Sequence, residues 1–204
     1  MSRPCLVVFS QVRWDFVYHR PQQLLSRLAA RWRVVYVEAP VHDEGPARLM
    51  VHSPAPGVTV IVPHTPVAAD GFHDEQLATL EPMLARWLTR HGARRAVVWL
   101  YTPMALPLVK TLEPLALVYD CLDEATTLPD APRQFHQRET ALLRRADLVL
   151  AGGPSLYDAL RGRHPNVHCV PGAVDAPHFA PPGPRADAGL VRRAKALQGA
   201  QQGA

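Results

Sequence analysis

The amino-acid sequence predicts an α/β protein with three layers, in which helices cover both faces of a mostly parallel sheet of about seven strands. Two observations support this fold class. Short continuous runs of apolar residues, in which polar residues do not alternate, are typical of strands that are buried on both faces. These runs alternate along the chain with stretches whose apolar residues recur at helical spacing, which indicates βαβ units.

Seven segments are expected to form the strands, and each is bounded by Gly, Pro or a change of pattern. The fifth segment begins as an unbroken apolar run and ends in acidic residues. The segments cover residues 5–10, 34–38, 58–62, 96–101, 115–123, 148–151 and 167–170.

Helices are expected between these strands. The first begins at Arg20-Pro21, where the missing N–H of proline costs nothing. The second has Asp74 as its N-cap and ends near Gly92, with Pro82 predicting a kink or a later start. Further helices are expected from 103, over 132–146, and from Ser155, where an acid three residues later resembles a capping box. The segment 41–57 is expected to be a loop because it is rich in Pro, Gly and His.

The composition is that of an ordinary soluble domain, with 204 residues, 48% hydrophobic residues and a net charge of +4. This charge is too small to indicate nucleic-acid binding, so no nucleic acid is expected as a partner. Three widely spaced cysteines favour a reducing compartment, and no apolar run has the ~20 residues that span a bilayer. The cytoplasm is the expected location. We expect one domain over 1–179 and a linker or low-complexity tail over 180–204.

The sequence lacks the motifs of several enzyme classes. The loop after the first strand carries no G-x-G-x-x-G, so a nicotinamide or flavin oxidoreductase is disfavoured. There is no G-x-x-x-x-G-K-[ST], no G-x-S-x-G and no H-E-x-x-H. The ten histidines are scattered without ligand spacing, so no metal site and no cofactor are predicted.

Candidate site residues follow the carboxyl ends of the predicted strands, where open α/β sheets bind their ligands. In the first loop, Trp14 precedes His19 and Arg20 at a helix start, and these two suit a general base and an anion contact. The alternative is that the aromatic residue packs on the sheet and that Arg20 pairs with an acid.

Carboxylates follow the fifth strand. Asp120, Asp123 and Glu124 suit hydrogen bonding to sugar hydroxyls or activation of an attacking hydroxyl; the alternative is a solvated turn with a helix cap.

The turn after the sixth predicted strand is a further candidate. Gly152, Gly153 and Ser155 enter a helix N-terminus, which suits a phosphate or a hydroxyl-rich ligand as well as plain turn chemistry. The expected helix before that strand carries four arginines: Arg133, Arg138, Arg144 and Arg145. They form either a solvated face or a contact surface for anionic lipid headgroups.

Taken together, these segments resemble the N-terminal half of a bacterial glycosyltransferase of the two-domain GT-B kind, of the family 1 and family 4 type. The resemblance rests on the order and spacing of WDFVYHRPQQ at 14–23, RVVYVE at 33–38, WLYTP at 99–103, VYDCLD at 118–123, Glu139 with LLRRADLV at 142–149, SLY at 155–157, and VPGAVD at 170–175 with HF at 178–179. It covers the chain up to Phe179. It implies a Rossmann-like domain, a nucleotide-sugar as co-substrate, and a cleft wall on the acceptor side that contains His19, Arg20, Asp120 and Asp123.

Two departures qualify what the resemblance implies. Gly172-Ala173 stand where the family usually has Asn-Gly. The donor-binding half is expected to be missing, so a separate donor-domain chain is an expected partner, beside an acceptor glycan or lipid-linked sugar. The expected role is acceptor-side sugar transfer in polysaccharide or glycolipid synthesis, in the cytoplasm or at the inner membrane face. The alternative is a non-catalytic module that binds a glycan or a partner protein.

Overall fold

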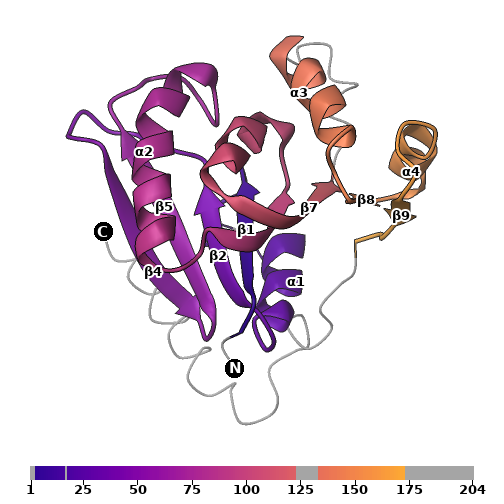
Figure 1. Cartoon of the computed structure of the whole chain (residues 1–204), viewed down its shortest axis with the longest axis horizontal. Coiled ribbons are helices and arrows are strands. Elements are labelled where there is room, and N and C mark those ends of the chain that lie inside the picture. Colours follow the sequence, from indigo (N-terminus) through magenta and orange to yellow (C-terminus); the bar gives the residue numbers. More distant parts are fainter. Residues whose placement is uncertain (1–2, 17, 123–132, 173–204) are drawn as a thin grey trace, which may run out of the picture. The chain divides into compact units, whose positions relative to one another are not determined.

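The computed structural model describes residues 3–16, 18–122 and 133–172. These residues form a nine-stranded sheet with helices on both faces, which confirms the predicted fold class (Figure 1). The strand order is β3-β5-β2-β1-β6-β7-β8-β9, and β4 pairs with β5 outside this path. All pairings are parallel except the antiparallel pair of β4 and β5.

The predicted strands occur within one to three residues of their expected limits. Their bounds are Cys5–Ser10 for β1, Arg33–Glu38 for β2, Val58–Thr65 for β5, Arg95–Leu100 for β6, Glu113–Cys121 for β7, Leu148–Ala151 for β8 and Val167–Cys169 for β9. All six residues of β1 are buried, as expected for a central strand with neighbours on both sides.

The prediction of a loop over 41–57 was wrong in part. This segment contains β3 (Val41–His42) and β4 (Arg48–Ala55), which raise the strand number from about seven to nine. Most residues of β4 are exposed, so its sequence lacks the apolar alternation that identifies a half-buried strand. Gly57 closes the turn into β5 with φ of 79°, a backbone conformation that favours glycine.

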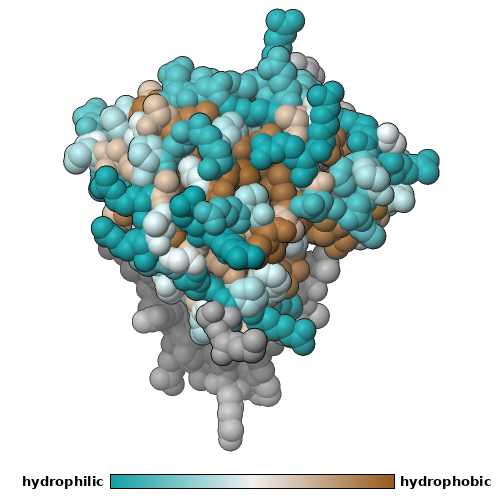
Figure 2. All heavy atoms as spheres, viewed as in Figure 1, coloured by the Kyte–Doolittle hydropathy of each residue, from teal (hydrophilic) through white to brown (hydrophobic). Residues whose placement is uncertain are grey.

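The sheet divides the core into two parts, each covered by helices. Helix α1 (Arg20–Leu28) packs on one face of the sheet through Leu25. The other face carries α2 (Asp74–Arg90), the 3-10 helix η1 (Pro103–Thr111), α3 (Arg133–Leu143) and α4 (Pro154–Leu160). On the side shown in Figure 2, hydrophobic residues gather at the centre, where Figure 1 shows η1, and hydrophilic residues surround them.

The ends of two helices differ from the prediction. His73, rather than Asp74, is the N-cap of α2, and its side chain accepts a hydrogen bond from the Glu75 backbone N–H. Pro82 neither starts nor ends α2, which continues through it while Leu80 and Leu84 on either side are fully buried. Tertiary burial therefore outweighs the lost backbone hydrogen bond at this proline.

Candidate functional site

Polar side chains from four neighbouring strands gather at the carboxyl edge of the sheet, on the face that α1 covers. Ser10 ends β1, Glu38 ends β2, Tyr101 follows β6 and Asp120 is the penultimate residue of β7. Side chains alternate between the faces of a strand. Tyr119 belongs to the core on the face opposite α1, so the next residue, Asp120, points to the face that α1 covers. The four residues form a polar row at the edge where parallel sheets bind ligands.

Arg20 and Asp120 form the central contact of this row. The Arg20 guanidinium donates from Nε to Oδ2 at 3.2 Å and from Nη2 to Oδ1 at 3.1 Å. The Asp120 side chain is 0% exposed and that of Arg20 is 15% exposed. Nη1 of Arg20 also donates to the carbonyl of Val170 at 2.6 Å, which connects the start of α1 with the chain after β9. Both Asp120 oxygens are thus engaged, and neither reaches solvent.

Two further polar groups surround the Asp120 carboxylate. The indole N–H of Trp99 and the hydroxyl of Tyr101 are buried, and neither makes a hydrogen bond with a described residue. Burial is the largest effect on the Asp120 carboxyl and raises its pKa above the usual value of 3.8, while the positive charge and the hydrogen bonds of Arg20 lower it. Burial likewise raises the pKa of Tyr101 far above its usual value. Trp99 and Tyr101 were not among the predicted site residues.

A cavity of about 360 Å³ opens beside the ion pair. Its lining includes His19, Arg20 and Gly152, and Val12, Pro21, Leu122 and Gly172 complete it. His19 is the exposed N-cap of α1, and its backbone N–H donates to the Gln22 side chain at 2.9 Å. The fold therefore brings His19 and Arg20 to the same cavity as the turn after β8, although more than a hundred residues separate that turn from Arg20 in the sequence.

The glycine turn after β8 has a structural role of its own. A Cβ on Gly152 would lie 3.2 Å from the Cys121 carbonyl oxygen and 3.1 Å from that of Leu122. Gly153, not Ser155, is the N-cap of α4, so the predicted capping box does not form. Ser155 is exposed, and neither Gly153 nor Ser155 lines the cavity. Asp123 and Glu124 lie outside the described residues.

Trp14 lies apart from this cavity. Its indole is buried and meets the ring of Tyr36 edge-on, with the centroids 5.1 Å apart. It lines a second cavity of about 360 Å³ with other residues of the loop after β1, among them Phe16 and Tyr18, and with Pro54 and Ala55 of β4. Trp14 therefore packs in the core on the α1 face and also lines this second cavity.

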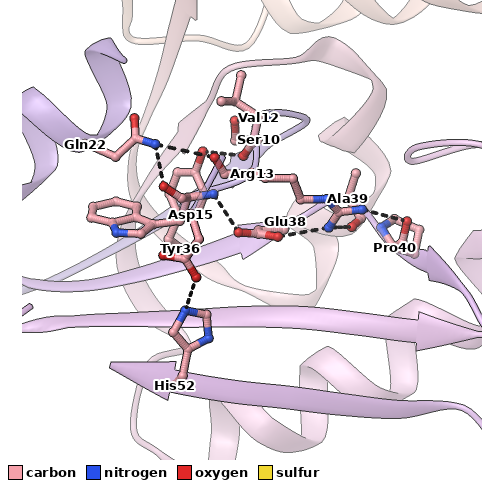
Figure 3. Close-up of polar contacts among 11 residues, drawn as sticks. Ser10, Val12, Arg13, Asp15, Gln22, Tyr36, Glu38, Ala39, Pro40 and His52 are labelled. Atoms are coloured by element: carbon pink, nitrogen blue, oxygen red, sulfur yellow. Dashed lines mark hydrogen bonds and ion pairs between the residues drawn. The ribbon is translucent and has the colours of Figure 1, made fainter. Parts of the chain in front are cut away.

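Glu38 holds the loop after β1 in place (Figure 3). Its side chain is buried, and Oε1 accepts from the backbone N–H of Trp14 at 2.8 Å. Oε2 forms an ion pair with Nη1 of Arg13 at 2.9 Å, and this nitrogen also donates to the carbonyl of Ala39. Glu38 was not among the predicted site residues, although a carboxylate at the end of an apolar strand is a signal for such a role.

The four arginines in and directly after α3 do not form a single solvated face. Arg138 is buried, donates to the carbonyls of Phe72 and Met104 at 3.1 and 2.9 Å, and contacts Asp74. Arg138 is therefore not part of the basic surface face that the sequence predicted. The other three arginines, Arg133, Arg144 and Arg145, are exposed. No helix within the described ranges is both long enough and apolar enough to cross a membrane.

Comparison with known proteins identifies the fold. The structure of sucrose-phosphate synthase from Thermosynechococcus elongatus aligns with a TM-score of 0.62 and 15% identity over 88% of this chain and 51% of the synthase. The fold is consistent with one Rossmann-like domain of the GT-B fold. A second structure of this synthase aligns with a TM-score of 0.52 and 16% identity over 84% of this chain and 90% of that one.

The GT-B likeness concerns the fold alone at this level of identity. The chain spans about half the length of the first synthase structure. No protein-family model matches the sequence, and no curated protein sequence matches it.

Proposed function

We propose that this chain is the acceptor-side domain of a glycosyltransferase that moves a sugar from a nucleotide-sugar to an acceptor hydroxyl. The observation that carries the proposal is the cavity at the carboxyl edge of a GT-B-type sheet, which His19 and Arg20 line together. Ligands of open α/β sheets bind at this edge. The acceptor would be a glycan or a lipid-linked sugar used in cell-surface polymer or glycolipid synthesis.

His19 is the proposed general base. Its imidazole would take the proton from the acceptor hydroxyl while the acceptor oxygen bonds to the anomeric carbon of the donor sugar. The bond from that carbon to the nucleoside diphosphate breaks in the same transfer, and the diphosphate leaves with the bonding electrons. The donor would be held by a second domain or a partner chain.

Asp120 acts as a positioning residue in this proposal. Its two oxygens accept from Arg20, so the carboxylate is not free to accept a proton from an acceptor. It holds the Arg20 guanidinium at the cavity wall, where the one N–H of Nη2 not used by Asp120 is left for a hydroxyl or an anionic group of the acceptor, since Nη1 donates to Val170 and Pro171. This role replaces the direct catalytic part that the sequence suggested for Asp120.

A second candidate function is a module that binds a glycan without transferring a sugar. The complete burial of the Asp120 carboxylate favours this function, because a buried carboxylate does not act as a base toward a ligand in the cavity. His19 is then the one described side chain of the lining that could act as a base. The two candidates share the binding site and differ in turnover.

The test measures glycan binding and sugar transfer separately. A glycan panel is titrated against the native protein, His19→Ala, and His136→Ala as a control with an exposed histidine on α3. Release of nucleoside diphosphate is then followed with uridine, guanosine and thymidine diphosphate sugars, with and without proteins that copurify with the chain. The proposal expects transfer to fall at least about 100-fold in His19→Ala and to stay unchanged in His136→Ala.

Other outcomes separate the alternatives. Glycan binding without turnover in every mixture would favour the binding module. Tight binding of a nucleotide-sugar at the His19 cavity by this chain alone, with no glycan bound, would overturn the acceptor-side assignment.

A further inference from the structure

Three arginines meet at the opposite edge of the sheet from the cavity described above. Arg3 precedes β1, Arg33 begins β2 and Arg95 begins β6. Strand β1 pairs with β2 on one side and with β6 on the other, and Cys5 is aligned with Arg33. The amino ends of three adjacent strands therefore carry one arginine each to a single place in the fold.

These side chains line a cavity of about 670 Å³. Pro4, Cys5, Gly57 and Gly92 complete its lining among the described residues, and none of these lining residues is a carboxylate. A Cβ on Gly92 would meet no atom within 4 Å, so the backbone there leaves open space. Gly57 approaches Arg3 closely, because its added Cβ would lie 3.3 Å from Nη1 of that arginine. The cavity is large enough for two linked phosphate groups.

Backbone carbonyls, rather than acids, hold two of the guanidinium groups. Arg3 donates from Nη1 to the carbonyl of Ala29, the C-cap of α1, at 3.0 Å. Arg33 donates to the carbonyls of His91 and Gly92 at 2.6 and 2.7 Å, at the C-terminal end of α2. These bonds use one of the five N–H donors of Arg3 and two of those of Arg33, which also interacts with the Cys5 thiol, so further donors on both arginines remain for a ligand.

The positive charge at this edge is not neutralised by the described residues. Within residues 3–16, 18–122 and 133–172, no carboxylate lies within 4.0 Å of Arg3, Arg33 or Arg95. The nearby acid Glu113 pairs with Arg94 at 3.1 Å. By contrast, the arginines at the carboxyl edge are paired, Arg20 with Asp120 and Arg13 with Glu38.

Helix capping by itself accounts for Arg3 and Arg33 but not for the whole arrangement. Arg95 is exposed and caps no helix among the described residues, yet it lines the same cavity. A planar guanidinium presents paired donors that match the oxygens of a phosphate, so convergent arginines without acids suit a multiply charged phosphate anion.

We propose that Arg3, Arg33 and Arg95 form a binding site for a diphosphate-type anion at the amino edge of the sheet. The carbonyl contacts preorganise Arg3 and Arg33, and Arg95 closes on the ligand from the β6 side. The two phosphate groups come from a free soluble diphosphate or from two neighbouring phospholipid headgroups. This site is separate from the acceptor cavity, and its test does not depend on sugar transfer.

The test titrates pyrophosphate against the full-length protein by calorimetry at low and at physiological salt. Arg95→Gln is the main variant because it removes no described structural contact, and Arg3→Gln is the second. Arg90→Gln is the matched control, since Arg90 is an exposed arginine at the end of α2 that lines other cavities. The proposal expects Arg95→Gln to weaken binding about tenfold, because charge-assisted hydrogen bonds are lost. Arg90→Gln is expected to change binding less than about twofold.

A vesicle arm distinguishes the two sources of the phosphate. If pyrophosphate releases the protein from phosphatidylglycerol vesicles but phosphatidylcholine vesicles never bind it, the headgroup is a ligand of the site. If pyrophosphate binds and neither vesicle does, the ligand is a soluble anion. Equal losses in Arg95→Gln and Arg90→Gln, or no pyrophosphate binding together with no vesicle binding, would overturn the proposal.

Discussion

Arg20 and Asp120 lie 100 positions apart in the sequence, and the structure joins them through two nitrogen–oxygen contacts of 3.1 and 3.2 Å. One residue begins α1 and the other lies near the end of β7, so the pair links a helix to the strand beneath it. A buried pair of this kind is costly to break on one side, because the remaining charge stays buried without its partner.

The first prediction concerns the stability of this pair. Asp120→Ala should lower the free energy of unfolding by about 3 kcal/mol, since it leaves the Arg20 guanidinium 15% exposed and unpaired from its acid. Asp158→Ala is the control, because Asp158 and its partner Arg161 are both more than 60% exposed, and it should change stability by less than about 0.5 kcal/mol. Urea denaturation measures both, and similar effects of the two substitutions would contradict the assignment.

The two glycines after β8 give a second, internally controlled prediction. Gly152→Ala places a methyl group 3.1 to 3.3 Å from backbone atoms of Cys121 and Leu122, which cannot move aside as a side chain would. We expect it to cost about 1 to 3 kcal/mol of stability. Gly153→Ala meets no atom within 4 Å at an extended backbone position, so its effect should be small. Thermal unfolding of the two variants provides the comparison, and a reversed order would show that the turn is free to shift.

Glu38→Gln should loosen the loop after β1. The substitution removes the charge that pairs with Arg13 and weakens the acceptor for the Trp14 backbone N–H. Phe16 is 79% exposed in this loop, so chymotrypsin should cleave after it several-fold faster in the variant than in the native protein. Glu44→Gln, an exposed position elsewhere, serves as the control. Unchanged cleavage in Glu38→Gln would mean that packing of Trp14 alone holds the loop.

Asp43 gives a prediction for the acid side of the stability profile. Hydrogen bonds from Arg48, from the Gly45 backbone and from His64 hold the pKa of this carboxyl well below its usual value of 3.8. A lowered folded-state pKa contributes stability above pH 3.8, and this contribution is lost as the pH falls toward the folded-state pKa. Asp43→Asn should therefore make the fall in urea midpoint below pH 4 shallower. An identical slope in both proteins would show that Asp43 is not involved.

Much of the fold was predictable from local patterns. The apolar run of β7 and the Leu80–Leu84–Leu88 stripe of α2 each show their periodicity within a few residues. Strand β4 was not predicted because it is an exposed edge strand, whose sequence does not need apolar residues at alternate positions.

The candidate site was predictable in position but less so in chemistry. The sequence placed Asp120 near the carboxyl end of a buried strand, and the structure has it there, within the last two residues of β7. Its partner could not be inferred, since nothing near Asp120 in the sequence indicates that Arg20 neutralises it. Glu139 is similar: it lies on the apolar side of α3 because Tyr119 and Arg163 bond its two oxygens.

Local sequence therefore carries the order of strands and helices, the face each helix buries, and the edge at which polar residues collect, because these follow from repeats of two and about 3.6 residues. The pairing of Arg20 with Asp120 follows instead from the place of α1 in the fold. The convergence of Arg3, Arg33 and Arg95 follows from the register and order of strands that are distant in the chain. Only the folded sheet brings those backbones side by side. Whether a charge is neutralised or left available for a ligand depends on that arrangement.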